Sequence, residues 1–99
     1  MKIALIGATG LVGNIMIKVL EERGFGKDDF IPAASSKSVG KEIQFSGHPY
    51  LIVSVEEAVS QNPDIAIFSA GSNISLTYAP IFAANGCTVI DNSSAWRNY

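Results

Sequence analysis

The sequence predicts an α/β fold with a doubly wound, mostly parallel sheet. Strand-like and helix-like segments alternate along the chain. The strand-like runs are apolar at successive positions rather than at every second one, as expected where helices cover both faces of a parallel sheet. In addition, glycines stand where the first strand-like run meets the first helix-like segment, at Gly7, Gly10 and Gly13.

The first third of the chain contains the pattern of a strand, a helix and a second strand. Residues 2–6 form a buried parallel strand, because their apolar residues follow one another without alternation. Residues 11–23 have helical apolar spacing, and Gly24 follows at the position of a C-terminal glycine cap. Residues 28–34 are a turn that leads into the second strand, in which Pro32 favours irregularity or an edge location.

The middle of the chain contains shorter elements. A polar loop at residues 35–41 precedes two β segments, at 42–45 and 50–53, with residues 46–49 as the turn between them. Ser54 followed by Glu57 is the pattern of a capping box, which predicts a short helix through residue 60.

Two strands and a helix complete the fold. Residues 65–69 form another buried strand, and a helix follows from about residue 74 to residue 84. Pro80 must bend or delay this helix, and Asn85-Gly86 ends it. Residues 87–91 form a fourth long strand. The whole pattern predicts one domain, from residue 1 to residue 99.

The composition excludes several classes of function. Of the 99 residues 47% are hydrophobic, and the net charge of −2 gives no basic surface for nucleic acid. The apolar runs are too short to span a bilayer, so we expect neither a nucleic-acid nor a membrane partner. The single cysteine, Cys87, fits a reducing cytoplasm. One histidine, one cysteine and scattered carboxylates have no metal-ligand spacing, so we predict no metal site.

The glycines predict a phosphate site. A helix N-terminus presents unpaired N–H groups and roughly half a positive charge, which favour a phosphate. Gly7 permits the tight turn, Gly10 allows close approach, and Gly13 lets the helix pack closely, while Thr9 adds a hydroxyl. The spacing G-x-x-G-x-x-G differs from the standard dinucleotide fingerprint, and no G-K-[ST] of a nucleotide-triphosphate loop is present. We therefore predict a Rossmann-like dinucleotide site.

The residues after the second strand favour NADP over NAD. An acidic residue there would bind the ribose hydroxyls of NAD, but the segment at 34–38 reads Ala-Ser-Ser-Lys-Ser. Lys37 supplies a cation for a 2′-phosphate, although a lysine binds as a point charge and more weakly than an arginine fork. The alternative is that Lys37 and Lys41 belong to an ordinary solvated loop.

Four stretches in order along the chain resemble aspartate-semialdehyde dehydrogenases. They are GATGLVG at residues 7–13, ASSKSVGK at 34–41, FSAGSNIS at 68–75 and VIDNSSAWR at 89–97. The chain resembles the N-terminal, NADP-binding portion of such an enzyme. The resemblance implies an oxidoreductase that reductively dephosphorylates aspartyl phosphate to aspartate semialdehyde through a cysteine thioester, in lysine, threonine and methionine biosynthesis.

The resemblance also implies roles for individual residues. The diphosphate of NADP would contact Thr9, Gly10, Leu11 and Val12 in the loop bounded by Gly7 and Gly13. The 2′-phosphate would lie among Ser35, Lys37 and Ser38, where the family usually has an arginine in place of the lysine. Ala70 and Gly71 would flank the cofactor, and Arg97 would bind the substrate phosphate.

The resemblance places the catalytic residues outside this chain. The nucleophilic cysteine, the catalytic histidine and a second substrate-binding arginine of the family lie downstream of residue 99. Cys87 is expected to be an inert core residue and His48 a surface residue, so we assign no catalytic residue. We expect the chain to bind cofactor without turnover. An unpaired sheet edge and an uncovered apolar face predict self-association, and the parent is expected to be a homo-oligomer.

Three alternatives remain open. An N-acetyl-gamma-glutamyl-phosphate reductase uses the same chemistry on another acyl phosphate, although the DNSSAWR segment favours the aspartate enzyme. An extended short-chain dehydrogenase shares the glycine spacing but needs a Tyr-x-x-x-Lys motif, which this sequence lacks. A sensor module that binds NADP without chemistry is the alternative from another class.

Overall fold

The computed structural model describes residues 1–24, 29–69 and 72–91. In this part of the chain four strands form a parallel sheet in the order β2-β1-β5-β6, and two further strands form an antiparallel hairpin. The sheet strands are β1 (Lys2–Ile6), β2 (Asp29–Ala33), β5 (Ile65–Phe68) and β6 (Thr88–Asp91), and the hairpin strands are β3 (Glu42–Phe45) and β4 (His48–Leu51). The predicted parallel α/β sheet is confirmed.

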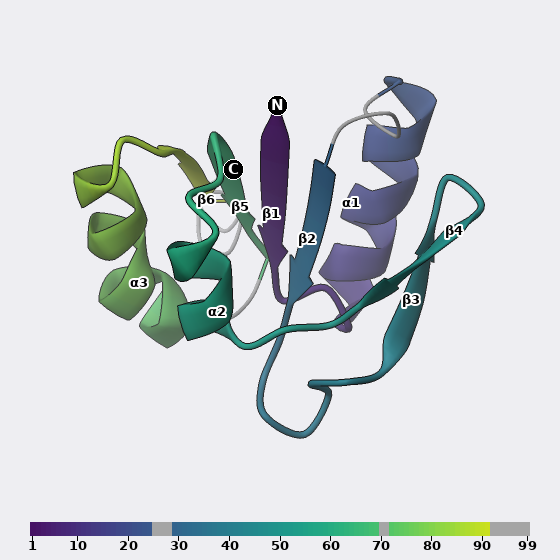
Figure 1. Cartoon of the computed structure of the whole chain (residues 1–99), viewed down its shortest axis with the longest axis horizontal. Coiled ribbons are helices and arrows are strands. Elements are labelled where there is room, and N and C mark those ends of the chain that lie inside the picture. The colour runs from purple at the N-terminus through teal and green to yellow at the C-terminus, as the bar shows by residue number, and fades with distance from the viewer. Residues whose placement is uncertain (25–28, 70–71, 92–99) are drawn as a thin grey trace.

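Helices lie on both faces of the sheet (Figure 1). They are α1 (Leu11–Glu22) on one face, and α2 (Val55–Ser60) and α3 (Ser72–Ala84) on the other. Because successive side chains of a strand point to opposite faces, β1 contributes to two separate cores. Leu5 packs in the cluster that contains Ile17 of α1, whereas Ala4 packs in the cluster that contains Phe82 of α3. This double cover explains the continuously apolar strands.

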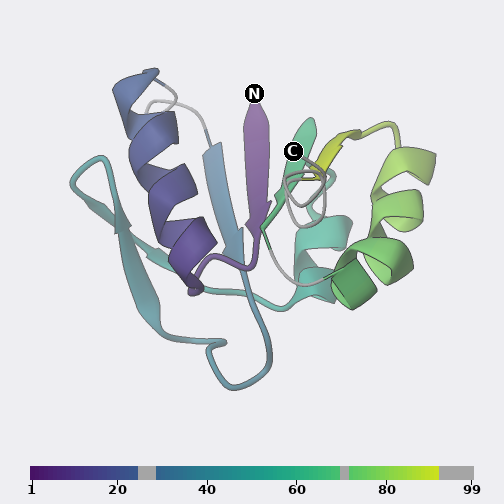
Figure 2. The ribbon, with the colours of Figure 1, turned by 180° about the vertical axis from the view of Figure 1, so that it is seen from behind.

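The order of the strands creates a switch point between β1 and β5. From β1 the chain passes through α1 to β2 on one side, and then returns through the hairpin and α2 to β5 on the other side of β1 (Figure 2). In the paired register Ile6 lies beside both Ala33 and Phe68, so β1, β2 and β5 end at the same edge of the sheet. The loops that leave these strands meet there, which is where ligands bind in open α/β sheets.

Pro32 lies in an edge strand, as predicted. In the described sheet β2 pairs along its length with β1 alone. Its other side is met by a single bridge between Ala33 and Val53 and by a 2.9 Å hydrogen bond from the Val53 N–H to the Pro32 carbonyl. A residue without an N–H is tolerated at such an edge.

The turn of the hairpin is shorter than predicted. It consists of Ser46 and Gly47, with φ of 51° and 81°, and β4 begins at His48 rather than at Tyr50. Two positive φ angles are the geometry of a two-residue turn whose twist matches the strands, so the predicted four-residue turn is wrong. His48 and Pro49 are ladder residues, paired with Phe45 and Gln44.

The short helix begins at the predicted cap. The Ser54 hydroxyl accepts a 3.0 Å hydrogen bond from the Glu57 N–H, and α2 runs to Ser60 as predicted. This cap matters for the site, because Val55 of α2 lines the cleft described below.

The third helix begins earlier than predicted. It starts at Ser72, and Pro80 lies inside it without ending or delaying it. The helix ends at Ala84, as predicted, and Gly86 follows with a φ of 83°. The Gly86 N–H donates to the Ala83 carbonyl and the Cys87 N–H to the Phe82 carbonyl.

Candidate functional site

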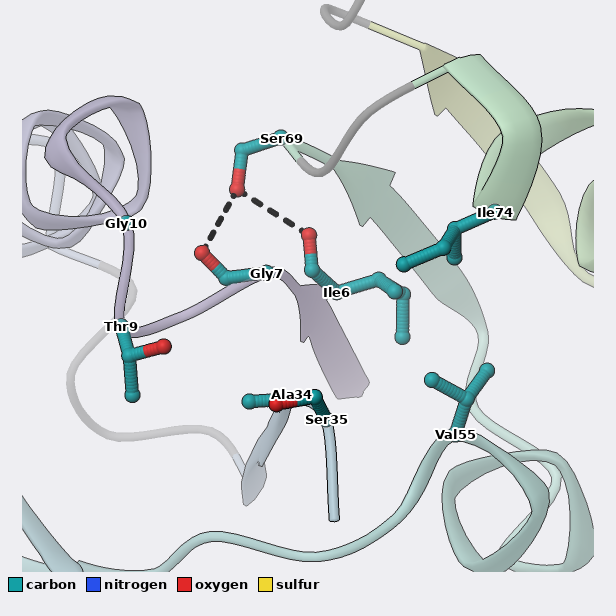
Figure 3. A pocket seen from close by; sticks show the side chains of 9 residues that line it. All are labelled: Ile6, Gly7, Thr9, Gly10, Ala34, Ser35, Val55, Ser69 and Ile74. Carbon is teal, nitrogen blue, oxygen red and sulfur yellow. Dashed lines mark hydrogen bonds between the residues drawn. The ribbon is translucent and has the colours of Figure 1, made fainter. Parts of the chain in front are cut away.

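A cleft of about 350 Å³ lies at the carboxyl ends of β1, β2 and β5 (Figure 3). Its polar lining consists of three hydroxyl groups and the backbone of the glycine loop, and none of the described lining side chains carries a charge. The lining residues are Ile6, Gly7, Thr9, Gly10, Ala34, Ser35, Val55, Ser69 and Ile74. An apolar cavity with a few convergent polar groups is typical of a cofactor site.

The glycine loop is fixed from the β2 side. The N–H groups of Gly7 and Ala8 both donate to the carbonyl oxygen of Ala33, at 2.8 and 3.1 Å. Gly7 has a φ of 94°, a conformation that other residues adopt only at a cost. The Gly10 N–H then donates to the Gly7 carbonyl at 3.2 Å, which closes the loop immediately before α1.

The start of α1 borders the cleft and has no side-chain cap. Gly10 is the N-cap, and within the described residues no side chain caps it and no acidic side chain lies in the first turn. The first backbone N–H groups of a helix have no partner within the helix, and the positive end of the helix dipole lies there. Leu11, Val12 and Gly13 form this first turn. The arrangement suits an anion that is bound by backbone amides.

Gly13 packs more closely than a side chain would allow. A β-carbon at this position would overlap the carbonyl oxygen of Gly7 and stand 2.8 Å from that of Ala8. The role of Gly13 in close packing is therefore supported, although the helix packs against the loop carbonyls in particular. At Gly10 a β-carbon would stand 3.7 Å from the Gly7 oxygen, an ordinary contact, so the fold itself does not require glycine there.

The predicted 2′-phosphate residues lie on the turn that leaves β2. Ser35 lines the cleft, and the Ser38 N–H donates to the Ser35 carbonyl at 2.9 Å. Lys37 is exposed on the same turn. The other predicted site residues, Ala70, Gly71 and Arg97, lie outside the described residues, and their roles stay predictions.

The sequence reasoning did not single out Ser69, Val55 or Ile74 as site residues. Ser69 follows β5, and its hydroxyl donates to the carbonyl oxygens of Ile6 at 3.0 Å and Gly7 at 3.1 Å. The available signal was a polar residue at the end of the predicted buried strand 65–69, which in the structure ends at Phe68. This signal identifies Ser69 as a site residue only once the strand order, which places β5 beside β1, is known.

Cys87 has the features of a core residue. Its side chain is 7% exposed, and burial, with a smaller contribution from the Asp64 carboxylate, raises the pKa of the thiol. It lies just before β6, whose first residue pairs with the first residue of β5, so it occupies the edge of the sheet opposite the cleft. A protonated, buried thiol far from the cleft is not suited to nucleophilic attack.

No helix among the described residues is both long enough and apolar enough to cross a membrane. In the same residues, no three His, Cys, Asp or Glu side chains are grouped so that they would hold a metal ion.

Comparisons with known proteins relate the chain to one family. The family described as "Semialdehyde dehydrogenase, NAD binding domain" matches residues 2–99. The aspartate-semialdehyde dehydrogenase of Aquifex aeolicus is 47% identical over 97 residues, which are 97% of this chain and 28% of that protein. The enzyme of the same name from Corynebacterium glutamicum is 47% identical over 98 residues, with coverage of 96% and 28%.

A solved structure matches the fold over nearly the whole of this chain. The crystal structure of aspartate semialdehyde dehydrogenase II complexed with ASA from Vibrio cholerae superimposes with a TM-score of 0.86 at 45% identity. The match covers 97% of this chain and 31% of that one. The chain thus spans less than a third of the length of these relatives.

Proposed function

This chain belongs to the semialdehyde dehydrogenase family, because it matches the NAD-binding domain of that family, and we propose that it is the NADP-binding part of an aspartate-semialdehyde dehydrogenase. The observation that carries the proposal is the uncapped start of α1, which borders the cleft behind a loop built of glycines. Relatives at 47% identity with the name of this enzyme support the choice of reaction.

The described residues fit a dinucleotide. The diphosphate is bound by the backbone amides of residues 10–13, where Gly10 allows close approach and Thr9 adds a hydroxyl at the wall of the cleft. The apolar side chains of Val55 and Ile74 enclose the more hydrophobic part of the cofactor. When bound, the nicotinamide group donates or accepts a hydride.

The residues after β2 support NADP. In the described turn at 34–41 no carboxylate is present to bind the ribose hydroxyls of NAD. Ser35, Lys37 and Ser38 instead supply hydrogen-bond donors and one positive charge, which suit a 2′-phosphate. Ala70 and Gly71 complete the cofactor site, and Arg97 binds the phosphate of the substrate.

The reaction requires groups that this chain does not supply. A cysteine thiolate attacks the acyl carbon of aspartyl phosphate, which forms a thioester and releases phosphate. A bound NADPH would supply the hydride that reduces this thioester to aspartate semialdehyde, and the thiolate would be released. Cys87 is buried at the far edge of the sheet and His48 is exposed on the hairpin, so neither is suited to these steps. We therefore propose that the catalytic domain lies elsewhere in a cytoplasmic, homo-oligomeric enzyme, and that residues 1–99 bind cofactor without turnover.

Titration calorimetry of the chain with NADP⁺ and NAD⁺ tests the cofactor assignment. NADP⁺ is expected to bind more tightly, and tighter binding of NAD⁺ would overturn the assignment. Absence of binding by either dinucleotide would overturn the proposed function as a whole.

A direct assay of the full-length protein, which follows the formation of NADPH, tests the reaction. With NADP⁺ and phosphate, oxidation of aspartate semialdehyde is expected. Activity only with N-acetyl-glutamate semialdehyde would assign the reductase alternative, and cofactor binding without turnover of either aldehyde would assign a sensor module.

A further inference from the structure

We propose that Ser69 positions the glycine loop for the diphosphate of the cofactor. This inference rests on the proposed function, because it concerns the same cleft. Ser69 acts through the loop, by means of hydrogen bonds to two backbone carbonyl groups, and its hydroxyl is the only part of the side chain that the proposal requires.

Ser69 is anchored across the switch point of the sheet. It directly follows β5, and its backbone N–H donates to the carbonyl oxygen of Ile6, the last residue of β1, at 2.8 Å. Its hydroxyl is directed to the same oxygen at 3.0 Å and to the Gly7 oxygen at 3.1 Å (Figure 3). The side chain is half-buried, so solvent competes only partly for these bonds.

The Gly7 carbonyl determines where the loop and helix begin. This oxygen also accepts the 3.2 Å bond from the Gly10 N–H, and it lies against the Cα of Gly13. On the opposite side the Gly7 N–H is held by Ala33 of β2. Each of the two peptide groups that flank Gly7 is therefore held on both sides, because its N–H donates to Ala33 of β2 and its carbonyl oxygen accepts from Ser69 after β5.

The hydroxyl also changes the electrostatics of the cleft. Ile6 and Gly7 both line it, and their carbonyl oxygens carry partial negative charge that would repel a diphosphate. A hydroxyl has one hydrogen, which two acceptors at 3.0 and 3.1 Å share or exchange. The partial positive charge of this hydrogen offsets the partial negative charge of the two oxygens. The electrostatic field in the cleft is then dominated by the backbone amides of α1.

The test compares three variants of Ser69 with a matched control. Ser69→Ala removes the donor, Ser69→Cys keeps a similar size with a weak donor, and Ser69→Thr keeps the hydroxyl. The control is Ser60→Ala, because the Ser60 hydroxyl also donates to a backbone carbonyl, that of Glu57 at 2.7 Å, but at the end of α2. Two quantities are measured: the Kd for NADP⁺, and the hydrogen-exchange rate of the Gly10 amide without nucleotide.

Loss of the donor is expected to act on both quantities. Ser69→Ala should raise the Kd for NADP⁺ by about 3- to 10-fold, the effect of one hydrogen bond, and should accelerate exchange of the Gly10 amide. Ser69→Cys should change the Kd and the exchange rate in the same direction. If Ser69→Ala does not fold, Ser69→Cys alone tests whether the donor is needed. Ser69→Thr and Ser60→Ala should resemble the wild type.

Two results would overturn the inference while the proposed function stands. One is a Kd for NADP⁺ that is unchanged in Ser69→Ala and Ser69→Cys although the wild type binds. The other is an equal loss of affinity in Ser69→Thr, which would assign the effect to side-chain shape. A wild-type chain that binds neither dinucleotide would overturn the proposed function itself, and this inference with it.

Discussion

A β-carbon at Gly13 would overlap the carbonyl oxygen of Gly7. The first turn of α1 and the loop before it thus touch through backbone atoms, without a side chain between them. Since a backbone carbonyl in a hydrogen-bonded loop has little freedom to move, this contact sets how near the start of the helix lies to the end of β1. Gly10 makes no such contact, so the two glycines that follow Gly7 differ in function.

Replacing Gly13 should damage the fold. In Gly13→Ala the new methyl group meets the carbonyl oxygens of Gly7 and Ala8, so the loop or the helix must shift. Such overpacking costs about 1 to 3 kcal/mol, which exceeds the gain of up to about 1 kcal/mol from alanine in a helix. Urea denaturation should show a lower midpoint than that of the wild type. An unchanged midpoint would mean that the contact is looser than described.

Replacing Gly10 should leave the fold intact and damage binding. Gly10 has φ −77° and ψ 172°, which alanine adopts readily, and its β-carbon would find only an ordinary contact at 3.7 Å. The unfolding midpoint of Gly10→Ala should therefore stay close to that of the wild type. The methyl group would occupy the space where the proposed diphosphate approaches the backbone, so calorimetry should show NADP⁺ affinity lowered by about tenfold or more. Unchanged affinity would place the diphosphate elsewhere.

Much of the fold was predictable because its signals are local. The glycine loop, the cap at Ser54 and the edge position of Pro32 each depend on a few adjacent residues, and the structure agrees with them. The turn of the hairpin is shorter than predicted, because proline is typical of turns but Pro49 belongs to β4. The first helix was predicted over residues 11–23 and ends at Glu22, with Ile17 buried and Ile15 53% exposed.

The site residues were predictable only where a local sequence pattern marks them. Gly7, Thr9, Gly10 and Ser35 were named from two loops, and all four line the cleft. Ser69 was missed because it acts through contacts with Ile6 and Gly7, which lie more than 60 positions earlier in the chain. No local sequence pattern reveals that β5 lies beside β1. Contacts of this kind depend on the strand order.

Removing the charge of Lys37 should reduce the preference for NADP. In Lys37→Gln the affinity for NADP⁺ should fall about 3- to 10-fold, because one ion pair to the 2′-phosphate is lost, whereas the affinity for NAD⁺ should not change. Lys18→Gln is the control, since Lys18 is an exposed lysine on α1. Both Kd values are measured by calorimetry at low and at high salt. An equal fall for both dinucleotides would show that Lys37 does not contact the 2′-phosphate.

The contact between α2 and α3 should be visible in a titration. The Tyr78 hydroxyl donates to the Glu56 carboxylate at 2.5 Å, and this bond lowers the pKa of Glu56 and raises the pKa of Tyr78. In Tyr78→Phe the pKa of Glu56 should therefore rise toward its ordinary value, as measured by NMR of the side-chain carboxyl carbon.

The sign of the accompanying stability change follows from the same pKa shifts. The lowered pKa of Glu56 contributes stability above the ordinary carboxyl range, and this contribution is lost as the pH falls through the lowered value. Glu56 is exposed and Tyr78 is only half-buried, so the effect of Tyr78→Phe on this hydrogen bond should be small at neutral pH and vanish in acid. Tyr50→Phe is the control, because Tyr50 belongs to the aromatic cluster under the hairpin. A shift of the Glu56 titration in that control would contradict the assignment.

The buried thiol of Cys87 should make stability fall on the alkaline side. Burial raises the pKa of Cys87 in the folded chain, so the native state holds the thiol proton more tightly than the unfolded state does. The resulting stability is fully present below the ordinary thiol pKa and is lost as the pH rises through the raised value. The free energy of unfolding, measured in urea between about pH 7.5 and about pH 10, should therefore fall more steeply in the wild type than in Cys87→Ala.

Reactivity of the same thiol provides an independent measurement. A thiol that is 7% exposed and protonated should react with an aromatic disulfide reagent only through transient opening of the fold. The reaction should be slow in buffer and fast in urea, and any dinucleotide that stabilises the native state should slow it further. Rapid modification of the folded chain near neutral pH would show that Cys87 is an accessible thiolate and a candidate nucleophile.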